Sequence, residues 1–117
     1  MPYQIIVSPV AQKQLAEVKD RRVRQALIQA IESLEENPEE KGKPLSGKLA
    51  GCFSVRAYAQ RYRIIYRINV SSKKVIILVL GLRKEGDRAD IYRLAERLIK
   101  AGLLLLMMFL CLVSDFP

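Results

Sequence analysis

Arginine recurs at short, regular spacing in the segment RYRIIYRI, which runs from residue 61 to residue 68. Successive side chains of a β-strand point to opposite faces, so Arg61, Arg63 and Arg67 fall on one face of a strand and mainly apolar residues on the other. Guanidinium groups are planar donors that match phosphate and carboxylate groups. The spacing therefore predicts an apolar core face and an arginine face that meets either water or an anion.

A further arginine is expected beside this face. The preceding segment, FSVRAY, is a strand pattern with Ser54, Arg56 and Tyr58 on one face. A tight turn at AQ joins the two strands antiparallel, and residues directly opposite each other then share a face. Arg56 would stand beside Arg63, which is unfavourable unless an anion or a carboxylate lies between them. This pair strengthens the prediction of an anion site.

The segment VIILVLGLR ends a third strand with another arginine. Both of its faces are apolar, as in a strand covered on both sides. Because the side chains of a strand alternate between its faces, Arg83 is expected on the same face as Val75, Ile77, Val79 and Gly81. Because glycine has no side chain, Gly81 would let another group approach the sheet closely. Three guanidiniums would then converge at one strand end. The alternative at this point is that acidic residues of the RKEGDRAD loop pair with Arg63 and Arg67, leaving Arg61 in water.

Composition narrows the class of protein and of site. The chain has 117 residues, with 20 Lys and Arg against 12 Asp and Glu, a formal charge of +8. This balance favours a nucleic acid, an anionic membrane surface or an acidic protein as partner, although it also fits a merely solvated basic surface. The chain has no histidine, and its two cysteines, Cys52 and Cys111, form no paired motif. A zinc cluster is excluded on this basis, and we expect no metal or cofactor.

The remaining segments predict the elements that position these residues. Residues 3–7 form a strand pattern, Ser8-Pro9 is a helix start, and Asp20 caps a second helix whose apolar residues recur at helical spacing from 23 to 34. Asn37-Pro38 ends that helix, and residues 39–51 are expected to be a loop. A final helix covers about 90–100. We predict an α+β domain of order β-α-α-β-β-β-α, a small antiparallel sheet with an N-terminal helical hairpin packed on one face.

The C-terminal segment differs in composition from the rest. Residues 1–100 are interpreted as one domain and residues 101–117 as a hydrophobic tail of unknown role. The apolar run from 103 to 113 has 11 residues, whereas a membrane-spanning helix needs about 20. We therefore expect no membrane span, and a tail that packs on the domain or on a partner, or an adventitious extension; contact with a membrane surface is the remaining alternative. No secretory signal pattern opens the chain, so the expected compartment is the cytoplasm.

The segments GCFSVRAYAQRYRIIYRI and VIILVLGLRKEGDRADIYRLAERL resemble the RelE/ParE superfamily of bacterial type II toxins, over residues 2–100. In that superfamily the RelE branch cleaves mRNA in the ribosomal A site, and the ParE branch inhibits DNA gyrase. The resemblance to the RelE branch implies a ribosome-dependent endoribonuclease that acts without metal and inhibits translation. Its implied partners are the ribosome, mRNA and a cognate acidic antitoxin, held through an amphipathic helix across the sheet edge or the final helix.

The resemblance also implies the site. Its catalytic positions fall on Arg56, Arg63, Arg83 and Tyr92. The residues expected to bind RNA or the ribosome are Lys48, Ser54, Tyr58, Arg61, Lys84 and Arg88. RelE-type enzymes commonly carry lysines where this chain has Ser54 and Arg56, and the loop after Arg83 is longer here. Retention of the arginine and tyrosine set favours the nuclease branch, because ParE-like members generally lack it. A gyrase inhibitor and a non-catalytic module that binds RNA or an antitoxin are the alternatives.

Overall fold

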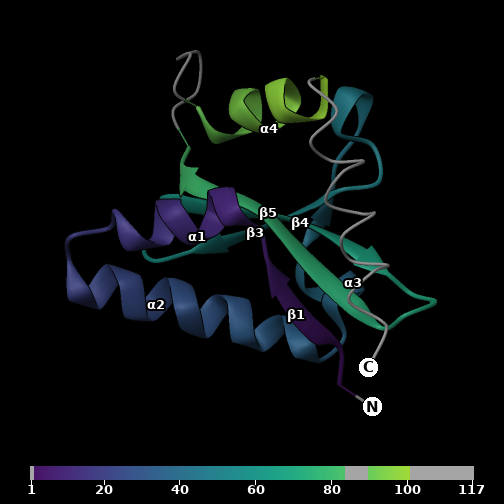
Figure 1. The fold of residues 1–117 in the computed structure, drawn as a ribbon, viewed down its shortest axis with the longest axis horizontal. Coiled ribbons are helices and arrows are strands. Elements are labelled where there is room, and N and C mark those ends of the chain that lie inside the picture. The colour runs from purple at the N-terminus through teal and green to yellow at the C-terminus, as the bar shows by residue number, and fades with distance from the viewer. Residues whose placement is uncertain (1, 84–89, 101–117) are drawn as a thin grey trace.

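A computed structural model of the chain describes residues 2–83 and 90–100 (Figure 1). The α+β architecture that the sequence predicts is confirmed; its sheet has five strands and is mixed rather than wholly antiparallel. The elements in chain order are β1 (Gln4–Val7), α1 (Pro9–Ala16), α2 (Arg21–Glu32), the 3₁₀ turn η1 (Ser33–Glu35), α3 (Pro38–Lys41), β2 (Lys43–Pro44), the 3₁₀ turn η2 (Gly47–Leu49), β3 (Phe53–Ala57), β4 (Tyr62–Asn69), β5 (Lys74–Leu82) and α4 (Ile91–Lys100). The predicted tail lies outside the described residues.

The two N-terminal helices begin where their capping residues predict. The Ser8 side chain accepts a hydrogen bond from the Ala11 N–H at 2.9 Å, and Pro9 occupies the first helical turn. Asp20 accepts from the Arg22 N–H, also at 2.9 Å. The apolar stripe of α2 is buried at Val23, Leu27 and Ile31. Together α1 and α2 form the expected hairpin.

The strands β3, β4 and β5 form the expected antiparallel meander, in the sheet order β1-β5-β4-β3-β2. β1 adds to the edge of β5 in parallel, which makes the sheet mixed. The segment 39–51, which we expected to be a loop, contains the short elements α3, β2 and η2. Elements of two to four residues are too short to show a helical or strand period, so the sequence pattern does not reveal them.

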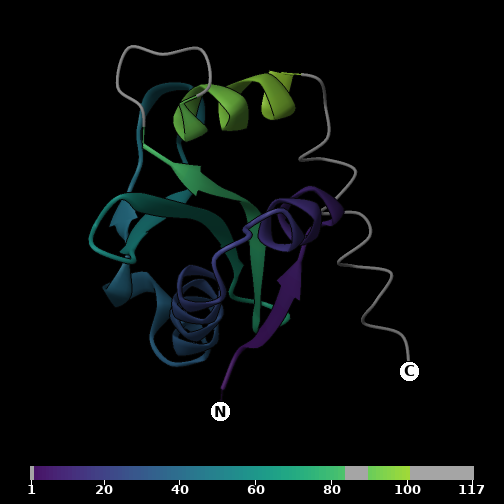
Figure 2. The ribbon, with the colours of Figure 1, turned by 90° about the vertical axis from the view of Figure 1, so that its left-hand side faces the viewer.

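The two faces of the sheet carry separate hydrophobic clusters. The cluster under the helical hairpin includes Leu27, Ile64 and Tyr66, each with no exposed surface. The cluster on the other face includes Ile65, Ile91 and Ala95 and is covered by α4. The two ribbon views place α4 and α2 on opposite sides of the sheet (Figures 1 and 2). The final helix thus contributes its apolar stripe to the core, as predicted.

A register shift in β5 changes which of its residues share a face. The pairing between β4 and β5 passes from Ile65↔Val79 to Tyr66↔Ile77, which leaves Leu78 as an extra residue. Ile77 therefore packs under the helical hairpin, whereas Val79 lies in the α4 cluster. The prediction that Val75, Ile77, Val79 and Gly81 share one face was wrong, because strict alternation does not survive a bulge.

Cys52 is buried and free, with 1% of its surface exposed. Burial raises the pKa of its thiol, and the nearby Arg67 guanidinium only partly opposes this. Cys111 lies outside the described residues. Within 2–83 and 90–100, no helix has the length and apolar composition needed to cross a bilayer.

Candidate functional site

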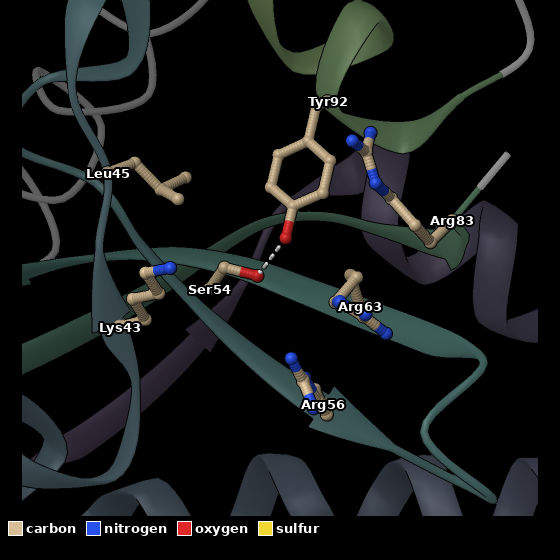
Figure 3. Close-up of a pocket in the computed structure, with 7 residues that line it drawn as sticks. All are labelled: Lys43, Leu45, Ser54, Arg56, Arg63, Arg83 and Tyr92. Atoms are coloured by element: carbon tan, nitrogen blue, oxygen red, sulfur yellow. Dashed lines mark hydrogen bonds between the residues drawn. The ribbon is translucent and has the colours of Figure 1, made fainter. Parts of the chain in front are cut away.

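A cavity of about 290 Å³ lies between the sheet and the first turn of α4 (Figure 3). Five segments of the chain contribute to it: β2 and the residue after it, β3, β4, the end of β5, and α4. The residues that line it are Lys43, Leu45, Ser54, Arg56, Arg63, Arg83 and Tyr92. Four of these side chains are cationic, so the cavity suits an anion.

The cross-strand arginine pair that the sequence predicts is present. Arg56 lies directly opposite Arg63 in the β3–β4 register, and Figure 3 shows the two side chains next to each other. Arg56 donates to the Gln60 side-chain carbonyl at 3.1 Å. Arg63 donates to the main-chain carbonyls of Gln60 and Tyr62. Among residues 2–83 and 90–100 these partners are all neutral, so both guanidiniums keep their full charge toward the cavity.

In the described part of the chain, the guanidinium of Arg83 is oriented by an acidic side chain, whereas those of Arg56 and Arg63 are oriented by neutral carbonyl groups. Its guanidinium forms an ion pair with the carboxylate of Asp90, whose side chain is 3% exposed. It also lies over the Tyr92 ring, with the guanidinium carbon 4.4 Å from the ring centre. Its main-chain N–H donates to the Arg61 carbonyl at 3.0 Å, which extends the strand pairing by one step. The alternative that acidic residues of the RKEGDRAD loop pair with Arg63 and Arg67 does not hold for Asp90, which pairs with Arg83; Glu85 and Asp87 lie outside the described residues.

Tyr92 points from the first turn of α4 toward the sheet. Its hydroxyl shares a hydrogen bond of 2.7 Å with the Ser54 hydroxyl, drawn as a dashed line in Figure 3. Ser54 is only 7% exposed, and either oxygen is able to donate. The bond fixes the phenol above the floor of the cavity. A lysine, common at this position in RelE-type enzymes, would place a charge where this chain has a neutral pair.

Gly81 explains why α4 lies so close to the sheet. A Cβ at this position would lie 3.1 Å from Cδ1 of Ile91, tighter than ordinary van der Waals contact. The close approach predicted for Gly81 is therefore made by the protein's own helix. Gly81 pairs with Arg63, so the contact brings the start of α4 over the arginine face. This contact places Tyr92 and Asp90 beside the arginines.

The structure brings five of the predicted site residues into one cavity: Ser54, Arg56, Arg63, Arg83 and Tyr92. Lys48 lies outside it, on η2, in a surface hollow of about 860 Å³ with residues of α4. Tyr58 is 39% exposed in the β3–β4 turn and does not line the cavity. Arg61 lines a smaller hollow of about 270 Å³ that shares Arg63 and Arg83 with the main cavity. Lys84 and Arg88 lie outside the described residues.

Four residues of the site were not anticipated from the sequence: Lys43, Leu45, Gln60 and Asp90. Lys43 lines the cavity because the two-residue strand β2 pairs it with Ser54. A strand of two residues is too short to show an alternating pattern in the sequence. The sequence placed Gln60 in the turn between β3 and β4 and did not predict its contacts with the arginines. Asp90 had a usable signal, since an acidic residue just before a helix is a common cap. No group of three metal-binding side chains occurs in the part of the chain that the structure describes.

The arrangement is chemically suited to bind a phosphate diester. Arginine donates through a planar fork that matches phosphate oxygens, and Arg56, Arg63 and Arg83 approach the cavity from three strands. Lys43 adds a fourth cation from the opposite wall (Figure 3). Tyr92 adds an aromatic ring, on which an unstacked base is able to pack.

Comparisons with known proteins identify the family to which this fold belongs. Residues 5–88 match the family model of the ParE toxin of the parDE type II toxin–antitoxin system. Toxin RelG of Mycobacterium tuberculosis is 36% identical over 93 residues, which cover 80% of this chain and 99% of RelG. The RelBE2 toxin–antitoxin complex of the same organism contains a chain that is 33% identical, with a TM-score of 0.63 over 71% of this chain and 100% of that one.

Two more distant structures share the fold. The isolated RelE toxin of E. coli is 21% identical, with a TM-score of 0.60 over 83% of this chain and 98% of its own. The ParDE system of P. aeruginosa contains a chain that is 13% identical, with a TM-score of 0.58 over 70% of this chain and 97% of its own. Since the family model spans most of the sequence and RelG aligns over nearly its whole length, this protein belongs to the RelE/ParE superfamily of type II toxin–antitoxin toxins.

Proposed function

We propose that this toxin is an endoribonuclease that cleaves mRNA on the ribosome and so inhibits translation. The observation that carries the proposal is the cavity itself, which gathers Arg56, Arg63, Arg83 and Tyr92 from two strands, a strand end and a helix. These are the positions at which the resemblance to the RelE branch implies catalysis. The match to RelG, a toxin named for that branch, supports the same assignment.

The proposed reaction needs no metal. The 2′-hydroxyl oxygen of one nucleotide attacks the adjacent phosphorus, the bond to the 5′-oxygen breaks, and a 2′,3′-cyclic phosphate remains. In the simplest form of this reaction the proton of the 2′-hydroxyl passes to water and the leaving 5′-oxygen takes a proton from water; the chain has no histidine for these transfers, and arginine is a very weak acid. The ribosome aligns the attacking and leaving oxygens, which lowers the entropic cost of reaching the transition state.

The arginines would act on the transition state. The pentavalent phosphorus carries more negative charge than the starting diester, so preorganised guanidiniums stabilise it more than they stabilise the substrate. Arg83 is already oriented by Asp90 and by the Tyr92 ring. Arg56 and Arg63 are oriented by carbonyl oxygens. The donors therefore need little reorganisation as the charge develops.

A second candidate function is inhibition of DNA gyrase, as in the ParE branch. It is favoured by the family model that matches residues 5–88, which is named for the ParE toxin. It predicts a toxic protein in which the cavity arginines are dispensable. A supercoiling assay with purified gyrase distinguishes the two, since an mRNA endonuclease leaves supercoiling unchanged.

The proposed partner is a cognate acidic antitoxin. The chain carries a formal charge of +8, and the M. tuberculosis relative was solved as a toxin–antitoxin complex. Opposite charge favours fast and selective association of such a pair. Co-expression with the product of the adjacent reading frame should yield a complex that co-purifies at low salt. Failure to co-purify under these conditions would contradict the proposed partner.

The experiment for the nuclease is primer extension on cellular mRNA after induction of the toxin. We expect growth arrest and cuts in phase with the reading frame. Arg83→Ala should abolish the cuts, whereas Arg22→Ala, which removes an exposed arginine from α2, should leave them unchanged. Because Arg83→Ala also removes an ion-pair partner of buried Asp90, the melting temperature of this variant must be compared with that of wild type. A folded Arg83→Ala protein that still cuts mRNA would refute the assignment of the site.

A further inference from the structure

The turn between β3 and β4 has an unusual backbone. Tyr58, Ala59 and Gln60 have φ values of 39°, 53° and 64°, so three consecutive residues occupy the left-handed region and none is glycine. Two-residue hairpin turns that require positive φ normally use asparagine, aspartate or glycine. An L-residue with a large side chain is disfavoured there. Backbone strain of this kind, when observed, indicates a requirement other than chain reversal.

What this turn achieves is the placement of Gln60. Its side-chain carbonyl accepts a hydrogen bond from Nη1 of Arg56 at 3.1 Å, and its main-chain carbonyl accepts one from Nη1 of Arg63. These two arginines are direct cross-strand partners, so their charges repel each other. One residue therefore contacts both members of the pair. No other residue in the described parts of the chain does so by hydrogen bonding.

A neutral acceptor has a specific advantage at this place. A carboxylate between the two arginines would neutralise their charge and compete with an incoming phosphate. An amide oxygen orients a guanidinium while leaving its charge intact. Each guanidinium offers five N–H donors, and the contacts with Gln60 occupy only Nη1 of each arginine. The remaining donors stay available to a ligand in the cavity.

We propose that Gln60 is a positioning residue, which holds Arg56 and Arg63 side by side and fully charged for a phosphate of the RNA. This rests on the proposed nuclease function. Gln60 acts through the arginines rather than on the reacting atoms. The strained turn is retained because it aims both carbonyl oxygens of Gln60 at the pair. Arg83, by contrast, is oriented by the carboxylate of Asp90.

Two substitutions separate this role from a structural one. Gln60→Gly keeps the main-chain carbonyl, removes the side-chain acceptor and relieves the positive φ, so the fold should be at least as stable as wild type. Gln60→Glu places a carboxylate between the arginines. The matched control is Gln25→Glu, which adds the same charge at an exposed position of α2.

The first measurement is single-turnover cleavage of mRNA on purified ribosomes, with rate and half-saturating toxin concentration determined separately. We expect Gln60→Gly to cut about tenfold more slowly, the order expected for loss of one charge-assisted hydrogen bond. Its half-saturating concentration should change little, and its melting temperature should not fall. Gln60→Glu should be slower still, and Gln25→Glu should stay within about twofold of wild type. A role of the Gln60 side chain in the fold alone predicts the opposite, a less stable glycine variant that cuts mRNA at the wild-type rate.

The second measurement does not depend on cleavage. Inorganic phosphate is titrated at constant ionic strength while the Nε–Hε signals of Arg56 and Arg63 are followed by NMR. We expect binding by wild type and Gln25→Glu, and binding at least about tenfold weaker for Gln60→Glu, since an internal carboxylate competes with the ion. Equal phosphate binding by all three proteins, or none by wild type, would overturn the role of Gln60. If wild type binds phosphate but cuts no mRNA, the proposed function fails while the role of Gln60 stands.

Discussion

Both faces of the sheet in this toxin carry a hydrophobic cluster, but beside the β3–β4 turn the two faces of these strands differ in chemistry. On the face under the helical hairpin, buried Ile64 and the partly buried Phe53 and Val55 pack into a hydrophobic cluster. On the other face, the neighbouring residues Ser54, Arg56 and Arg63 line an open cavity. Each polar residue is one position away from an apolar one. A strand therefore supports a charged site at no loss to the core, because alternation separates the two completely.

The helices that cover these faces also differ. The α1–α2 hairpin packs an apolar stripe onto its face of the sheet. α4 covers only part of the opposite face, with Ile91 and Ala95 buried and Tyr92 lining the cavity. Within residues 2–83 and 90–100, the arginines gather at the end of that face that α4 does not cover. A site thus forms where the covering layer is incomplete, which agrees with the general location of ligand sites in concave gaps between elements.

Neighbouring residues of β4 whose side chains point to opposite faces of the sheet test this separation most directly. The first substitution is Arg63→Ala. We expect cleavage to fall by about 10²–10³-fold, as for loss of a transition-state donor. Stability should change little, because Arg63 bonds only to carbonyls of the turn and of Tyr62. Single-turnover cleavage and thermal melting measure both effects. Arg67→Ala, on the same strand but outside the cavity, is the control and should keep its cleavage rate.

Tyr92 tests the contribution of α4 to the polar face. Tyr92→Ala should reduce cleavage by about 10- to 100-fold, since stacking on an aromatic ring contributes about 1–3 kcal/mol per base. Tyr92→Phe keeps the ring and the contact with Arg83 and loses only the bond to Ser54. We expect it to retain most of the activity. Equal losses for the two variants in the same assay would show that the hydroxyl, and not the ring, matters.

Tyr66 tests the stability of the apolar face, because its hydroxyl is the one polar group of a fully buried side chain. It has no exposed surface, and its hydroxyl donates to the Pro38 carbonyl at 2.7 Å. Tyr66→Phe leaves that acceptor without its donor, at a cost of about 1–3 kcal/mol in the free energy of unfolding. Denaturant titration measures the loss, and mRNA cleavage at saturating toxin should be unchanged.

The same residue predicts a pH dependence of stability. Burial, together with the charge of Glu39, raises the pKa of Tyr66 to about 12 from 10.0, against an opposing hydrogen bond from the Gly42 backbone. The unfolded chain therefore loses this proton first, and stability should fall as pH rises from about 10 to about 12. Tyr66→Phe should lack this component of the decline. An identical alkaline decline in both proteins would contradict the assignment.

The smallest expected effect is that of Ile64→Val, next to Arg63 in the chain. Ile64 is fully buried in the cluster under the hairpin. Removing one methylene group there should cost about 0.5–1.5 kcal/mol of stability. Cleavage should not change, because the side chain points away from the cavity. A change in the cleavage rate comparable with that of Arg63→Ala would show that the two faces are not independent.

The sequence by itself determined the parts that depend on local rules. Ser8 and Asp20 start their helices because their side chains satisfy free N–H groups of the first turn. Alternation in β3 and β4 assigned the core face, and a two-residue turn placed Arg56 opposite Arg63. The resemblance to a toxin family then pointed to Arg83 and Tyr92. Apart from the resemblance, which spans residues 2–100, each of these inferences uses residues within one element or one hairpin.

Tertiary structure alone decided how these pieces meet. The extra residue Leu78 moves Val79 to the face opposite that of Ile77, because a bulge resets alternation. Lys43 reaches the cavity only because β2 pairs with β3, and Asp90 reaches Arg83 only because Gly81 lets Ile91 pack closely on the sheet. Gln60 reaches both arginines through backbone angles that its residue type disfavours. Contacts of this kind depend on the packing of distant elements, which no local pattern specifies.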